Sequence, residues 1–356
     1  MAKVVVVGGG ITGASIALFR ARRGDEVTLL EASPVLGGQL STLREGGFVV
    51  EQGAEGFVAG SEAVAKLAAE LGVEGRIVGQ LTTKSYAFDG AVLHELARGE
   101  AAQFLGFQVP ARALGQGIRA FETGMSELVE SLSQKLRTIA DVRVSSPAKE
   151  LTLRAGRPAV VLGDAELAVE RVFVATSAQR ASELLAPVFG APATALGSAR
   201  TVSSVTVSLA YRRAAIEHAL DGTGFVVAEG AQREGFRACT FTTSKLAARA
   251  PHGYALLRAF FRPLGDEVTT LDDAAWARRA EHGIAAVLAP RAAPERTWVA
   301  RWPAALPVFD AEHRAHVAAL EAEIAGSGVF VAGAAFHGSG IDGALASARR
   351  VAEHSV

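Results

Sequence analysis

The stretch Lys3-Val4-Val5-Val6-Val7-Gly8-Gly9-Gly10-Ile11-Thr12-Gly13 joins a run of β-branched residues to a glycine-rich turn. A short apolar run directly before a turn is typical of a strand that is buried on both faces, as in a parallel sheet. Glycines occupy the three positions of the G-x-G-x-x-G pattern, which are Gly8, Gly10 and Gly13. These positions serve the tight turn, the close approach of a pyrophosphate and the packing of helix on strand. The stretch therefore predicts the central strand and the dinucleotide-binding turn of an α/β domain.

A helix and a second strand complete this unit. Residues 11–23 carry apolar side chains at helical spacing, so the N–H groups around Ile11 and Thr12 would face a pyrophosphate. The next strand, residues 26–31, ends at Glu31, at the roughly 20-residue offset where a carboxylate accepts a hydrogen bond from a ribose hydroxyl. Strand, helix and acid together favour a Rossmann-like dinucleotide site over a plain βαβ unit. The acid favours a ribose with a free 2′-hydroxyl.

Charge and cysteine content narrow the class of protein. The 356 residues include 36 basic and 37 acidic side chains, which gives a formal net charge of −1 and no electrostatic footprint for nucleic acid. The one cysteine, Cys239, excludes an internal disulfide framework and a multi-cysteine metal site, and is consistent with a reducing compartment. Its strand-like setting favours a buried small hydrophobe over a reactive thiol.

The start of the chain and its apolar runs predict a cytoplasmic protein. The first strand begins after two residues, which leaves no room for a signal peptide before it. No apolar run approaches the roughly 20 residues of a spanning helix. Peripheral contact with a membrane stays open, because it needs only an amphipathic patch.

The residues after the acid separate FAD from NAD. A pair of glycines, Gly37-Gly38, follows Glu31 by six residues, with hydroxyl side chains shortly behind. This run resembles the extended FAD-binding signature of the flavin amine oxidase and protoporphyrinogen oxidase superfamily. That superfamily more often has Arg where this chain has Gln39. The resemblance implies FAD as the cofactor, with one phosphate contact changed at Gln39.

Two further strand patterns indicate how the chain is divided. Residues 142–153, 157–162 and 165–169 have the alternation of a small antiparallel sheet between two segments of the nucleotide domain. Residues 83–96 have the pattern of a hairpin with Asp-Gly at its turn. Between residues 201 and 262, long strands follow one another without crossover helices, which indicates an antiparallel sheet and hence a second domain for the substrate.

The far end of the chain returns to the nucleotide domain. Residues 328–333 form another apolar strand, and residues 333–343 form a glycine-dense loop before the last helix. A second junction of this kind suggests that both ends of the chain build one cofactor site. The preceding helix, residues 311–324, carries His313 and His316, which we expect on a solvated face rather than on a metal ion.

The predicted fold class is therefore α/β, with a Rossmann-like FAD-binding domain of the p-hydroxybenzoate-hydroxylase type and an interleaved substrate domain built on an antiparallel sheet. The FAD-binding domain is assigned to residues 1–82, 121–200 and 311–356. The substrate-binding domain is assigned to residues 83–120 and 201–310.

The likeness extends beyond the nucleotide turn. From Cys239 to Arg258, and at Trp302 and Pro307, the chain resembles the FAD-dependent, oxygen-dependent protoporphyrinogen oxidase family, whose bacterial members include coproporphyrinogen oxidases. The resemblance implies stepwise dehydrogenation of a porphyrinogen to a porphyrin in heme biosynthesis. The implied partners are a small tetrapyrrole substrate and O2, which reoxidises FAD and leaves as hydrogen peroxide. A homodimer is compatible with the resemblance.

The chain departs from this family in two places. Family members have a helical subdomain that covers the substrate and mediates membrane association, between the positions of Asp89 and Met125 in this chain. About thirty residues connect the hairpin around Asp89 to the helix near Met125 here, too few for that subdomain given a rise of about 1.5 Å per helical residue. The second departure is Ala334, where the superfamily usually has Asp or Asn in contact with FAD.

Site residues follow from the motifs and from the resemblance. The predicted cofactor-binding residues are Gly8, Gly10, Ile11, Thr12, Gly13, Glu31, Ala32, Gly37, Gly38, Gln39, Gly53, Ala54, Ala148, Ala175, Thr176, Trp302, Gly333, Ala334, Gly340, Ile341 and Ala344. The predicted substrate-binding residues are Phe57, Phe241 and Arg258. Arg249, Arg258 and Arg301 could meet substrate propionates, although a structural ion pair is favoured for each. No metal is expected and no catalytic side chain is assigned, because a flavin itself accepts the hydride.

Two other functions stay open at this stage. An FAD-dependent amine or carotenoid-type oxidoreductase would keep the cofactor domain and use another substrate; the short connection favours it and the stretch from Cys239 to Arg258 opposes it. A non-catalytic flavoprotein would bind a tetrapyrrole without turnover, which the short connection and Ala334 favour.

Overall fold

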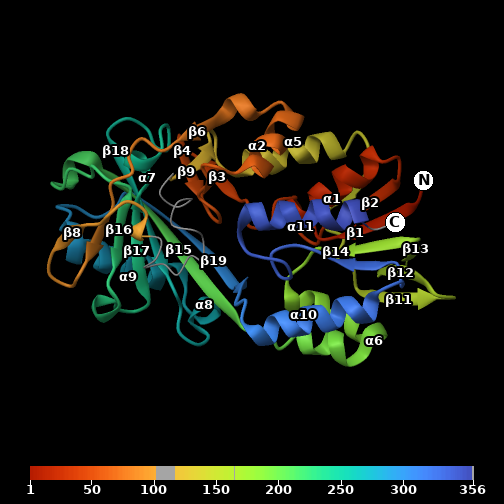
Figure 1. Cartoon of the computed structure of the whole chain (residues 1–356). Coiled ribbons are helices and arrows are strands. Elements are labelled where there is room, and N and C mark those ends of the chain that lie inside the picture. Colours follow the sequence, from red (N-terminus) through yellow and green to blue (C-terminus); the bar gives the residue numbers. More distant parts are fainter. Residues whose placement is uncertain (102–116, 164, 355–356) are drawn as a thin grey trace.

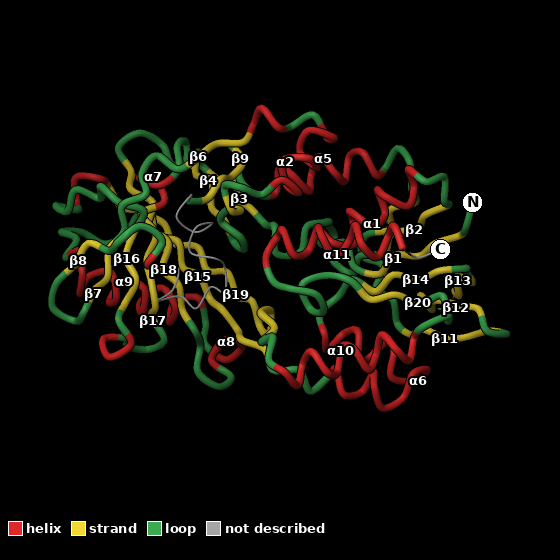
Figure 2. Tube along the Cα trace, viewed as in Figure 1, coloured by secondary structure: helices red, strands yellow, loops and turns green. Residues whose placement is uncertain are grey.

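A computed structural model describes residues 1–101, 117–163 and 165–354 of the chain, which form two lobes (Figures 1 and 2). One lobe holds both chain ends and a parallel sheet, and the other holds a longer, mainly antiparallel sheet. Residues 102–116, within the segment 83–120 predicted for the substrate domain, lie outside the described residues. Within the described ranges, no helix is both long and apolar enough to cross a membrane.

The first lobe is built on a parallel sheet whose strand order is β10-β2-β1-β14-β20. The valines of the central strand alternate between two cores, since Val4 and Val6 pack on one face and Val5 and Val7 on the other. All four are buried, which explains the unbroken apolar run in the sequence and confirms the predicted central strand. The strands are β1 (Lys3–Val7), β2 (Glu26–Leu30), β10 (Asp141–Arg143), β14 (Arg171–Val174) and β20 (Val329–Val331).

Helices cover both faces of this sheet, as a doubly wound fold requires (Figure 1). Four of them pack in the core of one face: α1 (Ile11–Arg22), α2 (Glu62–Leu71), α5 (Ser126–Leu136) and α11 (Gly340–His354). Two pack in the core of the other face: α6 (Ala178–Leu196) and α10 (Ala311–Ile324). A small antiparallel sheet continues from this second core, with strands β11 (Glu150–Arg154), β12 (Arg157–Leu162) and β13 (Ala165–Ala168).

The structure corrects two predictions in this lobe. Residues 142–153 were expected to start the small sheet, but Asp141–Arg143 forms β10, which pairs in parallel with β2 at the edge of the nucleotide sheet. His313 was expected on a solvated face and is instead 2% exposed. Its Nε2 is 2.8 Å from the carbonyl oxygen of Ala335, so it serves as a buried contact between α10 and the C-terminal loop, whereas His316 is half-buried.

The second lobe is a seven-stranded sheet with the order β19-β15-β18-β17-β16-β7-β8. Its strands pair antiparallel except β16 and β7, and β7 and β8 form the predicted hairpin around Asp89-Gly90. Helix α9 (Asp273–Leu288) packs on one face through the buried Trp276. The strands are β7 (Tyr86–Phe88), β8 (Leu93–Glu95), β15 (Thr201–Arg212), β16 (Gly224–Val227), β17 (Phe236–Phe241), β18 (Tyr254–Phe261) and β19 (Arg296–Pro307).

Short elements join the two lobes. The hairpin of β3 (Thr42–Glu45) and β4 (Phe48–Glu51) packs Phe48 and Val50 against Leu256 of the seven-stranded sheet. A further small sheet consists of β5 (Phe57–Val58), β6 (Ile77–Gly79) and β9 (Ile118–Phe121). Among the described residues, the remaining short helices are α7 (Thr242–Lys245), α8 (Glu267–Thr270), η1 (Glu74–Arg76), η2 (Arg213–Ala215) and η3 (Glu229–Ala231).

Candidate functional site

The three glycines of the first turn have different surroundings. A methyl group at Gly13 would lie 1.9 Å from the carbonyl oxygen of Gly8, and one at Gly8 would lie 2.5 Å from the carbonyl oxygen of Ala175. Gly8 also has φ +105°, a conformation that favours glycine. A methyl group at Gly10, by contrast, would meet nothing within 4 Å. Gly8 and Gly13 therefore allow close packing, while Gly10 borders open space.

This open space lies at the N-terminus of α1. Gly10 is the N-cap residue, no side chain caps the helix, and its first turn contains no acidic residue. Free N–H groups and the positive end of the helix dipole attract an anion. The side chain of Thr12, in the first turn of α1, is buried. The geometry at Gly10 thus fits the pyrophosphate of a dinucleotide.

Glu31 follows directly after β2 and lies beside the same turn. Its carboxylate accepts hydrogen bonds from the backbone N–H of Gly9, at 2.6 Å, and from that of Ser33, at 2.7 Å. Ala32, which lies between Glu31 and Ser33 in the sequence, has an exposed side chain. These bonds fix the carboxylate next to the turn, where the sequence places the ribose contact.

The paired glycines pack directly on the first turn. The N–H of Gly37 donates to the carbonyl of Gly9 at 2.9 Å, and Gly10 and Gly37 form an isolated parallel bridge. A methyl group at Gly38 would lie 3.3 Å from Cα of Gly10. Gly37 and Gly38 both have positive φ, +138° and +57°. The structure therefore brings together two motifs that the sequence separates by more than twenty residues.

A second turn, residues 52–54, packs on Gln39, the residue that follows the paired glycines. The N–H of Ala54 donates to the carbonyl of Gln39 at 3.0 Å, and a methyl group at Gly53 would lie 1.9 Å from that carbonyl oxygen. The side chain of Gln39 reaches away from this contact and donates to the carbonyl of Ala305 at 3.1 Å. Only glycine at position 53 permits this approach of the two turns.

The C-terminal loop meets the N-terminus of α1 from the other side. A methyl group at Gly333 would lie 3.0 Å from Oγ1 of Thr12, and the N–H of Gly333 donates to Oγ of Ser347 at 2.8 Å. Ala334, Gly340, Ile341 and Ala344 lie on the loop and in the first turns of α11. Ile341 and Ala344 are buried, whereas a methyl group at Gly340 would meet nothing within 4 Å. Both chain ends thus converge on the same turn, as predicted.

A histidine that the sequence did not single out holds this loop. His337 Nδ1 is 2.8 Å from Oγ of Ser347, and its Nε2 is 2.7 Å from Oε1 of Glu321. The hydrogen bond from His337 lowers the pKa of the Glu321 carboxyl. Loop, α10 and α11 are therefore tied together at one side chain, and the glycine-dense sequence around it gave no signal of this role.

The other predicted cofactor residues occupy the end of β14 and the neighbouring loop. The N–H of Ala175 donates to the carbonyl of Val7 at 2.8 Å. A methyl group added at Gly8 would lie 3.2 Å from Cγ2 of Thr176. Ala148 is buried, and its carbonyl accepts a hydrogen bond from Arg180. Ala175 and Thr176 border the turn itself, while Ala148 lies in the core of α6 and β11.

The seven-stranded sheet reaches the site through three donors, of which Oγ1 of Thr206 on β15 makes the longest bond, 3.4 Å to the carbonyl of Gln52. Nη2 of Arg258 donates to the carbonyl of Gly53 at 2.6 Å and to that of Gln52 at 3.2 Å. Nε1 of Trp302 donates to the carbonyl of Gln52 at 2.7 Å. Arg258 is 2% exposed, and this burial lowers the pKa of its guanidinium. These side chains hold the turn at residues 52–54 against the sheet.

Comparison with known families identifies the class of protein. Residues 6–71 match the NAD(P)-binding Rossmann-like domain, and residues 87–354 match the flavin containing amine oxidoreductase family, which together cover most of the chain. The chain belongs to this amine oxidoreductase family. It is an FAD-dependent oxidoreductase, and the open space at Gly10, the free end of α1 and the converging loops fit that cofactor.

The chain is similar to proteins with several different names. The coproporphyrinogen III oxidase of Bacillus subtilis (strain 168) is 23% identical over 448 aligned residues, which cover 95% of this chain and 94% of that protein. A solved structure from Exiguobacterium sp. 255-15, described as a candidate protoporphyrinogen oxidase, has a TM-score of 0.84 at 22% identity and covers 99% and 98% of the two chains. A carotenoid phi-ring synthase from Chlorobaculum tepidum is 55% identical over 60 residues, 15% of this chain and 9% of that protein.

The predicted substrate residues lie in different parts of the structure. Phe57 and Phe241 are buried in separate hydrophobic cores, 4% and 0% exposed. Arg301 forms an ion pair with Asp273 at 2.5 Å, and Arg249 donates to two carbonyls near the start of α5. These two arginines have structural partners, which was the favoured prediction. The substrate-binding role of Phe57, Phe241 and Arg258 stays a prediction.

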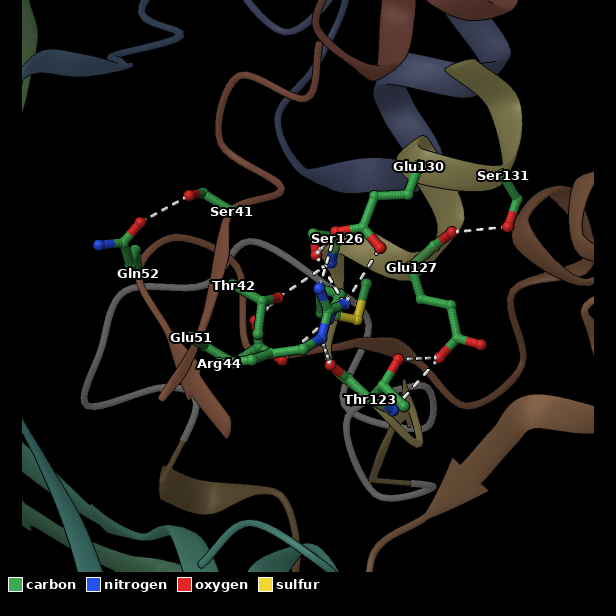
Figure 3. A network of polar contacts seen from close by, with 11 residues as sticks. Ser41, Thr42, Arg44, Glu51, Gln52, Thr123, Ser126, Glu127, Glu130 and Ser131 are labelled. Atoms are coloured by element: carbon green, nitrogen blue, oxygen red, sulfur yellow. Dashed lines mark hydrogen bonds and ion pairs between the residues drawn. The ribbon is translucent and has the colours of Figure 1, made fainter. Parts of the chain in front are cut away.

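A polar network that the sequence did not predict secures the hairpin next to the site (Figure 3). The buried carboxylate of Glu51 accepts from Oγ1 of Thr42 at 2.6 Å and from the N–H of Met125 at 2.9 Å. Burial raises the pKa of Glu51. Nearby, Arg44 forms an ion pair with Glu130 at 2.8 Å. The network ties β3 and β4 to α5, and so fixes the strand that leads into the turn at residues 52–54.

Proposed function

We propose that this FAD-dependent oxidoreductase oxidises a porphyrinogen, either protoporphyrinogen IX or coproporphyrinogen III, to the porphyrin in heme biosynthesis. The observation that carries the proposal is the full-length match to a coproporphyrinogen III oxidase, which covers 95% of this chain. The likeness to the protoporphyrinogen oxidase family from Cys239 to Arg258, a stretch that includes the end of β17 and the first half of β18 in the seven-stranded sheet, supports the proposal. The substrate is a small tetrapyrrole.

Bound FAD supplies the redox chemistry, since its ring accepts a hydride from the substrate. In each round the substrate loses two hydrogens. O2 accepts both and is released as hydrogen peroxide, so electrons and protons balance. The chain binds and orients the reactants. Gly10 leaves room for the pyrophosphate, Glu31 lies beside the ribose position, and the turn at residues 52–54 forms the wall toward the seven-stranded sheet.

The substrate site that we propose is more open than in the relatives. The alignment to the Bacillus subtilis protein runs over 448 residues, more than the 356 of this chain. That relative therefore carries insertions. We expect the protein in the cytoplasmic fraction after lysis without detergent; recovery chiefly in detergent-extracted membranes would contradict an open, uncovered site.

The experiment that tests the proposal is anaerobic mixing of the FAD-loaded protein with each porphyrinogen separately. Flavin absorbance and porphyrin fluorescence are followed together, and air is then admitted. We expect flavin bleaching with porphyrin formation, followed by flavin recovery and hydrogen peroxide release in air. A flavin that stays oxidised with both substrates would refute the proposal, and bleaching without recovery in air would refute O2 as the acceptor.

A second candidate function rests on one observation, the short match at 55% identity to a carotenoid phi-ring synthase. A carotenoid-type oxidoreductase would share the FAD domain and differ in substrate. The same anaerobic assay with a carotenoid in detergent micelles separates the two, because only the true substrate bleaches the flavin. Porphyrin binding that quenches flavin fluorescence, with no bleaching by any substrate, would instead indicate a non-catalytic flavoprotein.

A further inference from the structure

Arg258 lies at the meeting point of the two lobes. It stands on β18, where it pairs with Ser208 of β15 and Thr240 of β17, so it occupies the middle of the seven-stranded sheet. Its sequence neighbours Leu257 and Ala259 point into the core beneath α9. Because side chains alternate along a strand, Arg258 points to the opposite face, toward the first lobe.

The hydrogen bonds of Arg258 begin a chain of direct contacts to the pyrophosphate turn. Nη2 donates to the carbonyls of Gln52 and Gly53. The next residues along the turn contact Gln39 through the N–H of Ala54 and through the close approach at Gly53. The paired glycines before Gln39 then contact the first turn, since the N–H of Gly37 donates to the carbonyl of Gly9. Three contacts between segments thus connect the seven-stranded sheet to the glycine turn before α1.

The surroundings of Arg258 argue against a free cation waiting for a substrate carboxylate. The side chain is 2% exposed, and its guanidinium carbon lies 4.9 Å from the centre of the Phe260 ring. The carboxylates of Glu51 and Glu55 attract it, and Glu55 also forms an ion pair with Lys245 at 2.7 Å. Nη2 of this buried, stacked guanidinium bonds to two backbone carbonyls, whereas Nε and Nη1 have no hydrogen-bond partner among the described residues. The bonded edge is suited to holding the backbone in place.

We propose that Arg258 is a positioning residue for FAD, which acts through the carbonyls of Gln52 and Gly53 on the turns that border the cofactor. Trp302 assists, because its Nε1 donates to the same carbonyl of Gln52. The proposal concerns the cofactor and does not depend on which substrate the enzyme oxidises.

The test compares Arg258→Lys with a matched control, Arg249→Lys. Arg249 is also buried, 1% exposed, and also donates to two backbone carbonyls, those of Phe121 and Glu122, which lie outside the contact chain. Its ion pair with Glu51, the residue before Gln52, is long, at 3.9 Å. Lysine keeps the charge but cannot reproduce the planar guanidinium contacts. Apoprotein of each variant is titrated with FAD by fluorescence quenching, and its thermal unfolding midpoint is measured without FAD.

We expect both variants to unfold at a lower temperature, while only Arg258→Lys weakens FAD binding, by about tenfold, the equivalent of one lost charge-assisted hydrogen bond. Trp302→Phe removes one donor to the same carbonyl and should weaken FAD binding by a smaller factor, which keeps the test valid if the arginine variant does not fold. Equal FAD affinity in Arg258→Lys and in wild type would overturn the proposal. So would an increase in KM for a carboxylate-bearing substrate at unchanged FAD affinity, which would make Arg258 a substrate ligand.

Discussion

Replacing Gly10 by alanine should separate cofactor binding from folding. Gly10 has φ −66° and ψ 176°, which alanine adopts without strain, and its methyl group would meet nothing within 4 Å. We therefore expect the free energy of unfolding of the apoprotein to stay within about 0.5 kcal/mol of wild type. The same methyl group would fill the space at the N-terminus of α1 that we assign to the pyrophosphate.

The expected loss of FAD affinity follows from the contacts that a displaced pyrophosphate would give up. Two charge-assisted hydrogen bonds to helix N–H groups, at about 1.5 kcal/mol each, amount to about 3 kcal/mol. This corresponds to a dissociation constant about 100-fold higher in Gly10→Ala than in wild type.

Gly13→Ala is the matched control, because here the methyl group would lie 1.9 Å from the carbonyl oxygen of Gly8. Overpacking against a fixed backbone atom costs about 3 kcal/mol, and the better helix propensity of alanine offsets about 1 kcal/mol of this. The apoprotein of Gly13→Ala should therefore be destabilised by about 2 kcal/mol.

Two measurements on each variant decide the matter: FAD titration of the apoprotein by fluorescence quenching, and thermal unfolding of the apoprotein. If Gly10→Ala bound FAD within about threefold of wild type, our assignment of the open space to the pyrophosphate would be refuted. A Gly13→Ala apoprotein that unfolds at the wild-type temperature would refute the packing argument instead.

Three further outcomes are expected from other parts of the fold. Burial raises the pKa of the Glu51 carboxyl, so its ionisation destabilises the folded state as the pH rises above the usual pKa of 4.5. The free energy of unfolding of Glu51→Gln, relative to that of wild type, should therefore increase with pH when both are unfolded in urea at a series of pH values. A difference that stays constant with pH would contradict the direction of the pKa shift. Ser347→Ala removes the acceptor of the buried N–H of Gly333 and should lower the free energy of unfolding by about 1–3 kcal/mol, whereas Ser131→Ala, whose hydroxyl bonds within its own helix, should change it by less than about 0.5 kcal/mol. Cys239 is 1% exposed and its burial raises the pKa of the thiol, so a thiol reagent should label the protein only when urea unfolds it; rapid labelling of the native protein would contradict this burial.

The sequence predicted the features that depend on neighbouring residues. The central strand, the glycine turn and α1 follow from a continuous run of residues, whose hydrophobic pattern predicts a buried strand and then a helix. The long strands of the second lobe also follow from local patterns, since no helix separates most of them. The antiparallel pairing of β15, β17 and β18 confirms that prediction.

The predictions that failed depend on contacts between distant segments. Asp141–Arg143 is only three residues long, and nothing in its composition shows that it pairs with β2. His313 lies on a helix with little separation between polar and apolar faces, so its burial under Ala335 could not be read from spacing. The contacts of Arg258 with Gln52 and Gly53 depend on how the two lobes pack against each other, and the sequence of one strand does not show that packing.

The order of strands in the parallel sheet has a consequence for synthesis of the protein. β1, which carries the pyrophosphate turn, pairs with β14, and β14 pairs with β20, so the sheet combines the first and the last strands of the described chain. Helix α11, which follows β20, packs on α1 and completes the core over the turn. While the ribosome is still adding residues at about 5–20 per second, this half of the fold cannot close. The nascent protein can pair β1 with β2 and β14 early, but it cannot add β20 to the sheet until Val331 has left the exit tunnel, nor cover α1 with α11 before that.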